Sequence, residues 1–229
     1  MFCRKLMQIS ALGVMALAAI PAQADVVYTF NATAVGAYGA GPYGTVTLHE
    51  SGGNVNFTVN LRPDMDFINT GNAHELFSFN AFDVATTDIT NVLFHGTSLA
   101  QVLTVTGGTN SPYGVFTLGF DCTGDNSLCP GGGSSPGFFA DPLTFTVLNA
   151  QYSDFGILSG LPPASFGADV INCIGVTSNC TTGTGSIAVT GPGISTPNEV
   201  PEPLTMSLFA SGLAAIAFLR RRRLQAVKA

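Results

Sequence analysis

The sequence predicts an all-β protein with a single sandwich or jelly-roll-like domain. Short segments rich in β-branched and aromatic residues alternate between apolar and polar positions, as half-buried strands do. The 27 glycines and 13 prolines interrupt these segments at intervals of about ten to fifteen residues. No stretch before residue 204 shows the periodicity of an amphipathic helix. Many short strands joined by Gly-rich turns are typical of sandwiches and jelly rolls.

The individual strands follow from the same pattern. Val26–Ala34 is the first predicted strand. Thr45–Leu48 and Val55–Leu61 flank Ser51-Gly52-Gly53-Asn54, which predicts a hairpin. The remaining predicted strands are Leu76–Phe82, Gln101–Thr106, Val115–Phe120, Leu143–Leu148, Asp169–Ile174 and Ser186–Thr190. Between Cys122 and Pro142 the chain is rich in Gly, Ser and Pro, which predicts a long exposed loop.

Residues 1–24 predict a signal peptide. Arg4 and Lys5 precede the apolar run Ile9–Ile20, and Ala22-Gln23-Ala24 has the small-x-small form of a signal peptidase site. The mature chain is therefore expected to begin at Asp25, after export by the general secretion machinery. The alternative, a permanent N-terminal membrane helix, needs a longer apolar run.

The last 30 residues form a second processing segment. Val200, Pro201, Glu202 and Pro203 precede the apolar run Leu204–Leu219, which as a helix would span roughly 24 Å of a hydrocarbon core about 30 Å thick. Arg220, Arg221, Arg222 and Arg223 follow and should stay cytoplasmic. This order predicts a transmembrane helix, a body outside the cytoplasmic membrane and a short cytoplasmic tail. The alternative is a permanent C-terminal anchor with a chance Pro-Glu-Pro.

This tail resembles the PEP-CTERM sorting signal, which exosortases of Gram-negative bacteria read and process. The resemblance implies processing near Val200–Pro203, an intermediate tethered to the inner membrane, and a final place at the cell surface or outside the cell. It also implies association with exopolysaccharide. In the body, Leu76–Asn80, and Phe166–Asp169 with Gly183–Ser186, resemble segments of other proteins with this tail, which implies a β-rich surface domain.

The predicted organisation has five parts. They are a signal peptide at 1–24, a sandwich-like extracytoplasmic domain at 25–193, a linker at 194–199, the sorting signal at 200–223 and the cytoplasmic tail at 224–229.

Residues 25–199 are strongly acidic. They contain Arg62 as their only Lys or Arg and carry thirteen Asp and Glu residues. Because affinity for nucleic acid comes from cations on phosphates, this composition argues against a nucleic-acid partner. Binding to anionic lipid or acidic polysaccharide would need bridging divalent cations.

The four cysteines of the body form two pairs with the same spacing. Cys122 and Cys129 enclose six residues, as do Cys173 and Cys180. An even number of cysteines in an exported chain predicts disulfides, and the local pairing is one of three connectivities. A zinc site would need shorter ligand spacings.

No motif predicts a catalytic set. His49, His74 and His95 lack the zincin spacing, and the G-x-S-x-G match at 133–137 has Pro136 where an oxyanion-hole N–H is needed. Oxygen ligands in loops of an acidic exported domain can bind Ca²⁺. The weak candidates for such a site are Asp64, Asp66, Asp121 and Asp125. Their alternative role is that of solvated turn residues, so no cofactor is predicted.

The sequence therefore predicts a non-catalytic, exosortase-processed surface protein associated with the envelope. One alternative is a Ca²⁺- or glycan-binding β-module. Because the chain has no Trp, its five tyrosines would then have to supply the sugar platform. The other alternative is a secreted hydrolase with a carboxylate pair, for which Glu50 and Glu75 are the only Glu of the body core.

Overall fold

The computed structural model describes residues 24–34, 38–68, 70, 74–99, 102–122, 140–172 and 182–196. All of them lie in one compact unit, 23–197. The predicted sorting signal, the cytoplasmic tail and all but the last residue of the predicted signal peptide lie outside these ranges. Within the described ranges, no helix is both long enough and apolar enough to cross a membrane.

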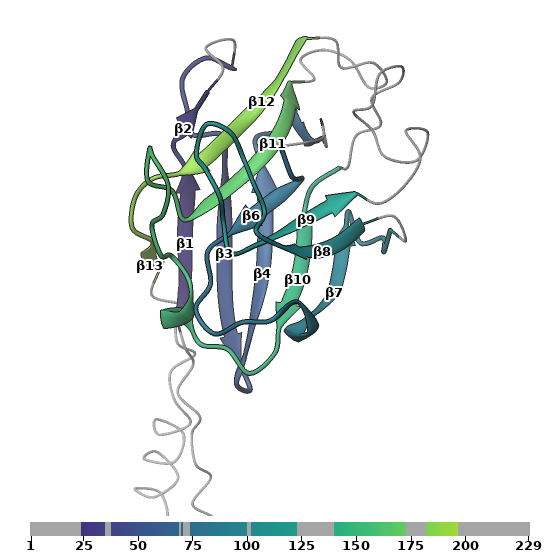
Figure 1. The fold of residues 1–229 in the computed structure, drawn as a ribbon, viewed down its shortest axis with the longest axis vertical. Helices are drawn as coiled ribbons and strands as arrows, with labels where there is room; N and C mark the ends of the chain where they lie inside the picture. Colours follow the sequence, from purple (N-terminus) through teal and green to yellow (C-terminus); the bar gives the residue numbers. More distant parts are fainter. Residues whose placement is uncertain are drawn as a thin grey trace, which may run out of the picture. The chain divides into compact units, whose positions relative to one another are not determined.

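Two antiparallel sheets pack together as a sandwich, which confirms the predicted all-β class (Figure 1). The first sheet has six strands in the order β13-β1-β3-β4-β10-β7. Their bounds are Ile194–Thr196, Asp25–Phe30, Gly44–Ser51, Asn54–Leu61, Leu143–Val147 and Ile89–Phe94.

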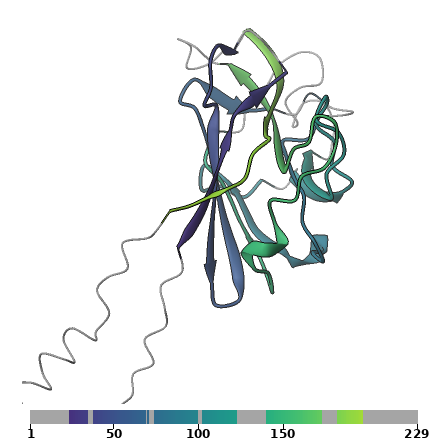
Figure 2. The ribbon, with the colours of Figure 1, turned by 90° about the vertical axis from the view of Figure 1, so that its left-hand side faces the viewer.

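The second sheet has seven strands and covers one face of the first, as Figure 2 shows from the side. Its main order is β2-β12-β11-β6-β9-β8, and β5 pairs with β11 beside this path. Their bounds are Ala32–Thr33, Thr182–Val189, Phe166–Asn172, Phe77–Phe79, Leu118–Cys122, Val102–Thr106 and, for β5, Met65–Phe67. In the described connections lie the 3₁₀ turns η2 (Thr86–Asp88) and η3 (Tyr152–Asp154).

Phenylalanine rings from both sheets fill the space between them. Along β4 every second side chain is buried, and Phe57 stacks on Phe145 of β10 with ring centroids 4.4 Å apart. Phe79 of the other sheet packs 5.8 Å from Phe57. Each ring removes a large apolar area from water, so this aromatic layer supplies much of the stabilisation of the sandwich.

The predicted hairpin is confirmed. Ser51 of β3 is the register partner of Asn54 of β4, so only Gly52 and Gly53 form the turn. Both glycines have positive φ, +62° and +76°. Two consecutive left-handed residues are what a two-residue hairpin of the favoured twist requires.

The first predicted strand is split between the two sheets. β1 pairs with β3, whereas β2 pairs with β12 of the other sheet. The chain changes sheet at Asn31, whose side-chain oxygen accepts hydrogen bonds from the N–H and hydroxyl of Thr190. The continuous alternation over 26–34 predicts extended chain but carries no signal for this change of partner.

The predicted linker at 194–199 begins too early. Ile194–Thr196 forms β13, which pairs with β1 and places Thr196 opposite Asp25 (Figure 1). The free edge of β1 offers unpaired N–H and C=O groups, and this segment satisfies them. The β-domain therefore extends to residue 196, and its first and last strands are neighbours.

Candidate functional site

The predicted processing sites lie at or beyond the limits of the described chain. Ala24 directly precedes β1, and Asp25 is the first residue of that strand. The carboxylate of Asp25 lies 2.7 Å from Nδ1 of His49 on β3. Val200–Pro203 and Arg220–Arg223 lie outside the described residues, so the sorting motif and the membrane stop stay predictions.

Of the four cysteines predicted to form disulfides, the structure describes Cys122. Cys122 is the last residue of β9. Cys129, Cys173 and Cys180 lie outside the described residues, as does most of the predicted loop from Cys122 to Pro142. The pairing of the four cysteines therefore stays a prediction.

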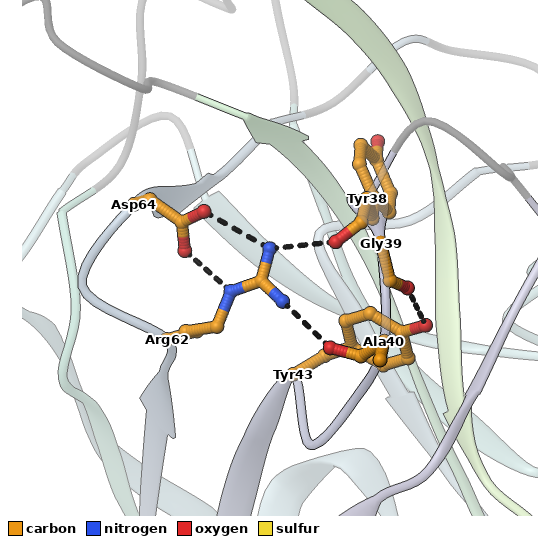
Figure 3. A network of polar contacts seen from close by, with 6 residues as sticks. All are labelled: Tyr38, Gly39, Ala40, Tyr43, Arg62 and Asp64. Carbon is orange, nitrogen blue, oxygen red and sulfur yellow. Dashed lines mark hydrogen bonds and ion pairs between the residues drawn. The ribbon is translucent and has the colours of Figure 1, made fainter.

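Arg62 is the centre of a polar network between two loops (Figure 3). Its guanidinium donates to both carboxylate oxygens of Asp64, at 2.5 and 2.9 Å. It also donates to the backbone carbonyls of Tyr38, at 2.9 Å, and Ala40, at 3.2 Å. The ring of Tyr43 lies beneath it, 5.4 Å from the guanidinium carbon. The network fixes the 38–43 loop against the turn that precedes β5.

The weak calcium candidates that the structure describes lie in separate places, each with its own protein contacts. Both oxygens of Asp64 accept from Arg62. Asp66 lies within β5, and burial, with a smaller effect of Asp141, raises its pKa. Asp121 lies in β9 and accepts from the N–H of Cys122 at 2.7 Å. Asp125 lies outside the described residues. In the described part of the chain, no group of three or more His, Cys, Asp or Glu side chains could hold a metal ion.

A second polar cluster lies where β11 and β12 are neighbours. Asp169 of β11 is fully buried and stands opposite Ser186 of β12. Its Oδ2 accepts from the N–H of Thr70 at 3.0 Å and from its hydroxyl at 2.6 Å. Its Oδ1 is buried and has no hydrogen-bond partner among the described residues. Because burial disfavours the ionised form, the pKa of Asp169 is raised to about 6.

Side chains from three further segments complete this cluster. Nδ1 of His74 lies 3.1 Å from the hydroxyl of Ser186. The amide of Asn110 donates to the carbonyl of Glu75 and to the hydroxyl of Ser78. The side chain of Glu75 accepts from the N–H of Thr109. Burial raises the pKa of Glu75 to about 7.

Ser186, His74 and Asp169 have the composition of a nucleophilic triad but not its arrangement. The hydroxyl of Ser186 is fully buried, so a substrate carbonyl has no path to it. Asp169 accepts from Thr70 and not from the ring of His74. A triad needs an exposed nucleophile and an acid that orients the histidine. The cluster is therefore best described as a polar anchor that fixes Thr70, His74, Glu75 and residues 109–110 to the sheet.

The carboxylates considered for a hydrolase belong to different parts of the sandwich. Glu50 lies on β3 of the six-stranded sheet and accepts from the N–H of Tyr152 at 3.1 Å. Glu75 lies two residues before β6 of the other sheet and belongs to the polar anchor. Each has a local structural partner, on a different sheet of the sandwich.

The tyrosines do not form a sugar platform. Tyr28, Tyr38, Tyr43 and Tyr113 are buried, and Tyr152 is half-buried. The hydroxyl of Tyr38 donates to the carbonyl of Val170 at 2.8 Å, which ties the 38–43 loop to β11. A ring that stacks on a sugar must expose its face, so these residues serve packing.

No sequence motif predicted the polar anchor. Its clearest signal is Asp169, an acid in the middle of the otherwise uncharged strand β11, in which every residue is buried. A buried acid inside a strand has to find a partner on the neighbouring segments. No protein-family model matches the chain, and neither a curated protein nor a solved structure shows significant similarity to it.

Proposed function

We propose that this chain is an exported, non-catalytic surface protein whose β-sandwich is delivered by an exosortase-processed C-terminal tail. The observation that carries the proposal is the order of three features at the end of the sequence. The Pro-Glu-Pro at 201–203 comes first, the apolar run Leu204–Leu219 second and four arginines last. Together these give a recognition segment, a membrane-length helix and a cytoplasmic stop.

The geometry of the strand ends supports this role. Asp25, the expected first residue of the mature chain, is the register partner of Thr196. The two ends of the body therefore lie side by side at one end of β1, next to His49. Only four residues separate Thr196 from Pro201, so the connection between the β-sandwich and the sorting motif is short.

The environments of the polar residues favour a non-catalytic body over the two alternatives. Ser186 is buried, Asp64 is held by Arg62, and four of the five tyrosines serve the core. Under this proposal, the signal peptide is removed after Ala24, the run 204–219 spans the inner membrane before processing, and the released body associates with envelope or exopolysaccharide.

The intact mass of the protein from its native host tests the proposal, together with its C-terminal peptide. We expect a chain that begins at Asp25 and ends near Pro203, with four hydrogens missing if two disulfides form. Glu202→Ala should leave Arg220–Arg223 attached, whereas Asn198→Ala, outside the motif, should be processed like the wild type. A wild-type chain that retains Arg220–Arg223 would overturn the proposal.

A further inference from the structure

Ser78 and Asn110 bring two groups that can react with each other into contact inside the polar anchor. Ser78 lies on β6, between β11 and β9 (Figure 1), and Asn110 lies in the connection between β8 and β9. The amide nitrogen of Asn110 donates to the hydroxyl of Ser78 and, at 3.2 Å, to the carbonyl of Glu75. Ser78 and Asn110 are both fully buried. A hydroxyl and a carboxamide are therefore held together away from bulk water, a pair that can release ammonia and form an ester.

Two glycines make the room for this contact. The register partners of Ser78 on the neighbouring strands are Gly119 of β9 and Gly167 of β11. A Cβ on Gly167 would lie 3.2 Å from Cβ of Asn110. A Cβ on Gly119 would lie 3.5 Å from Cγ of Glu75. Because register partners point their side chains to the same face of a sheet, Asn110 and Glu75 lie over the same face as the hydroxyl of Ser78.

The amide oxygen of Asn110 has a hydrogen-bond donor in place. The hydroxyl of Ser186 on β12 donates to Oδ1 of Asn110 at 3.4 Å. Negative charge would develop on this oxygen during attack on the amide carbon. A donor that is already aimed at such an oxygen stabilises the transition state, and it does so most effectively where water is excluded. Ser186 is fully buried, so it meets this condition.

Glu75 can carry the proton that such a reaction has to move. Burial raises the pKa of Glu75 to about 7, so near neutral pH its carboxylate can take up a proton and give it back. Its side chain accepts from the N–H of Thr109, which directly precedes Asn110, and its backbone carbonyl accepts from the amide nitrogen of Asn110. Glu75 therefore borders both the hydroxyl that would lose a proton and the nitrogen that would leave.

We propose that Ser78 and Asn110 join in an intramolecular ester bond, which the folded chain forms from its own side chains. The amide of Asn110 turns its face to the hydroxyl, Oγ of Ser78 attacks Cγ of Asn110, and the hydroxyl proton passes to the carboxylate of Glu75. The Cγ–Nδ2 bond then breaks, and Nδ2 takes that proton and leaves as ammonia. One hydroxyl and one amide give one ester and one ammonia, so the reaction needs no oxidant and no external substrate.

The bond links positions that are 32 residues apart in the sequence. It holds the connection between β8 and β9 to an inner strand of the sheet and, like a disulfide, restricts the unfolded chain. Each chain reacts once with itself, so the proposal goes beyond the surface role and does not depend on export or sorting.

Mass spectrometry of the full-length chain, reduced and denatured, tests the proposal. The wild type should be lighter than its sequence by one molecule of ammonia. After proteolysis, the peptide that contains Ser78 should be joined to the peptide that contains Asn110. Ser78→Ala should retain the ammonia and give separate peptides. The matched control is Ser165→Ala, at a fully buried serine directly before β11, and it should link like the wild type.

Closure of the Asn110 side chain onto its own backbone is a competing source of the same mass loss. That succinimide also releases ammonia, but it leaves the two peptides separate and persists in Ser78→Ala. A wild type with its full mass would overturn the proposal, and so would a loss of ammonia that persists in Ser78→Ala.

A further variant tests the donor to the amide oxygen. In chain collected in urea before it folds and then diluted, Ser186→Ala should slow the linking by about a hundredfold, because a donor to the developing charge is lost. Its circular dichroism signal should return as in the wild type. An unchanged linking rate would contradict the assignment of Ser186 as that donor.

Discussion

All the hydrogen bonds of the Arg62 guanidinium described above are made to groups of the same domain. Arg62 is the only Lys or Arg between residues 25 and 199. Its planar guanidinium meets the two oxygens of Asp64 and the carbonyls of Tyr38 and Ala40. A lysine ammonium cannot reproduce this fork. The cation is therefore used within the domain and is not presented to a ligand.

Asp169 should make stability depend on pH. Its pKa is raised to about 6, against an ordinary value of about 3.9. Between these values the folded state binds more protons than the unfolded state, so the free energy of unfolding falls as pH rises. The fall attributable to Asp169 should be about 2–3 kcal/mol between pH 4 and pH 7. Urea unfolding across this pH range measures it.

Asp169→Asn should make this pH dependence shallower without removing it, because burial also raises the pKa of Glu75. The matched control is Asp83→Asn, at an exposed position with a positive φ that asparagine accepts. An unchanged pH dependence in Asp169→Asn would show that the carboxylate is not destabilised by burial.

Among the strands, local patterns predicted some features well and others poorly. Clear alternation located β3, β4 and β10 to within a few residues, and the two glycines located their turn. β5 and β7 were missed, because β5 has only three residues and β7 is interrupted at Asn91. The strand predicted from Asp169 begins at Phe166 because its pattern is buried on both faces and does not alternate.

The Gly52-Gly53 turn yields a prediction for the hairpin. A Cβ on Gly52 would meet no atom within 4 Å, so a substitution there is opposed only by its φ of +62°. Gly52→Val should lower the free energy of unfolding by about 1–2 kcal/mol, because a left-handed conformation strains a β-branched residue. Gly52→Asn should cost less, since asparagine tolerates this conformation. Equal urea midpoints for the two variants would contradict this account.

The domain combines an aromatic core with a predominantly negative set of charged side chains. Most of its thirteen carboxylates have no cation to pair with, since Arg62 is taken by Asp64. Such a surface repels itself in the compact state. Stability should therefore depend on ionic strength more than on individual ion pairs.

Salt should stabilise the chain. Raising NaCl from about 0.01 to 0.5 M shortens the screening length from about 30 Å to a few Å and weakens the repulsion between carboxylates. We expect the melting temperature of the full chain to rise, and KCl to have the same effect as NaCl if screening is the cause. A melting temperature that falls with salt would mean that attractive pairs outweigh the repulsion.

By itself, the sequence determined the all-β class, the hairpin at Gly52-Gly53 and the acidic character of the body, and it carries the expectation of export and sorting. Alternation, turn residues and composition are properties of neighbouring residues, so they can be read along the chain. Only the tertiary structure decided the change of sheet at Asn31, the docking of β13, and the partners of Arg62 and Asp169. Each depends on which distant segment is adjacent, and local patterns do not specify such long-range pairings.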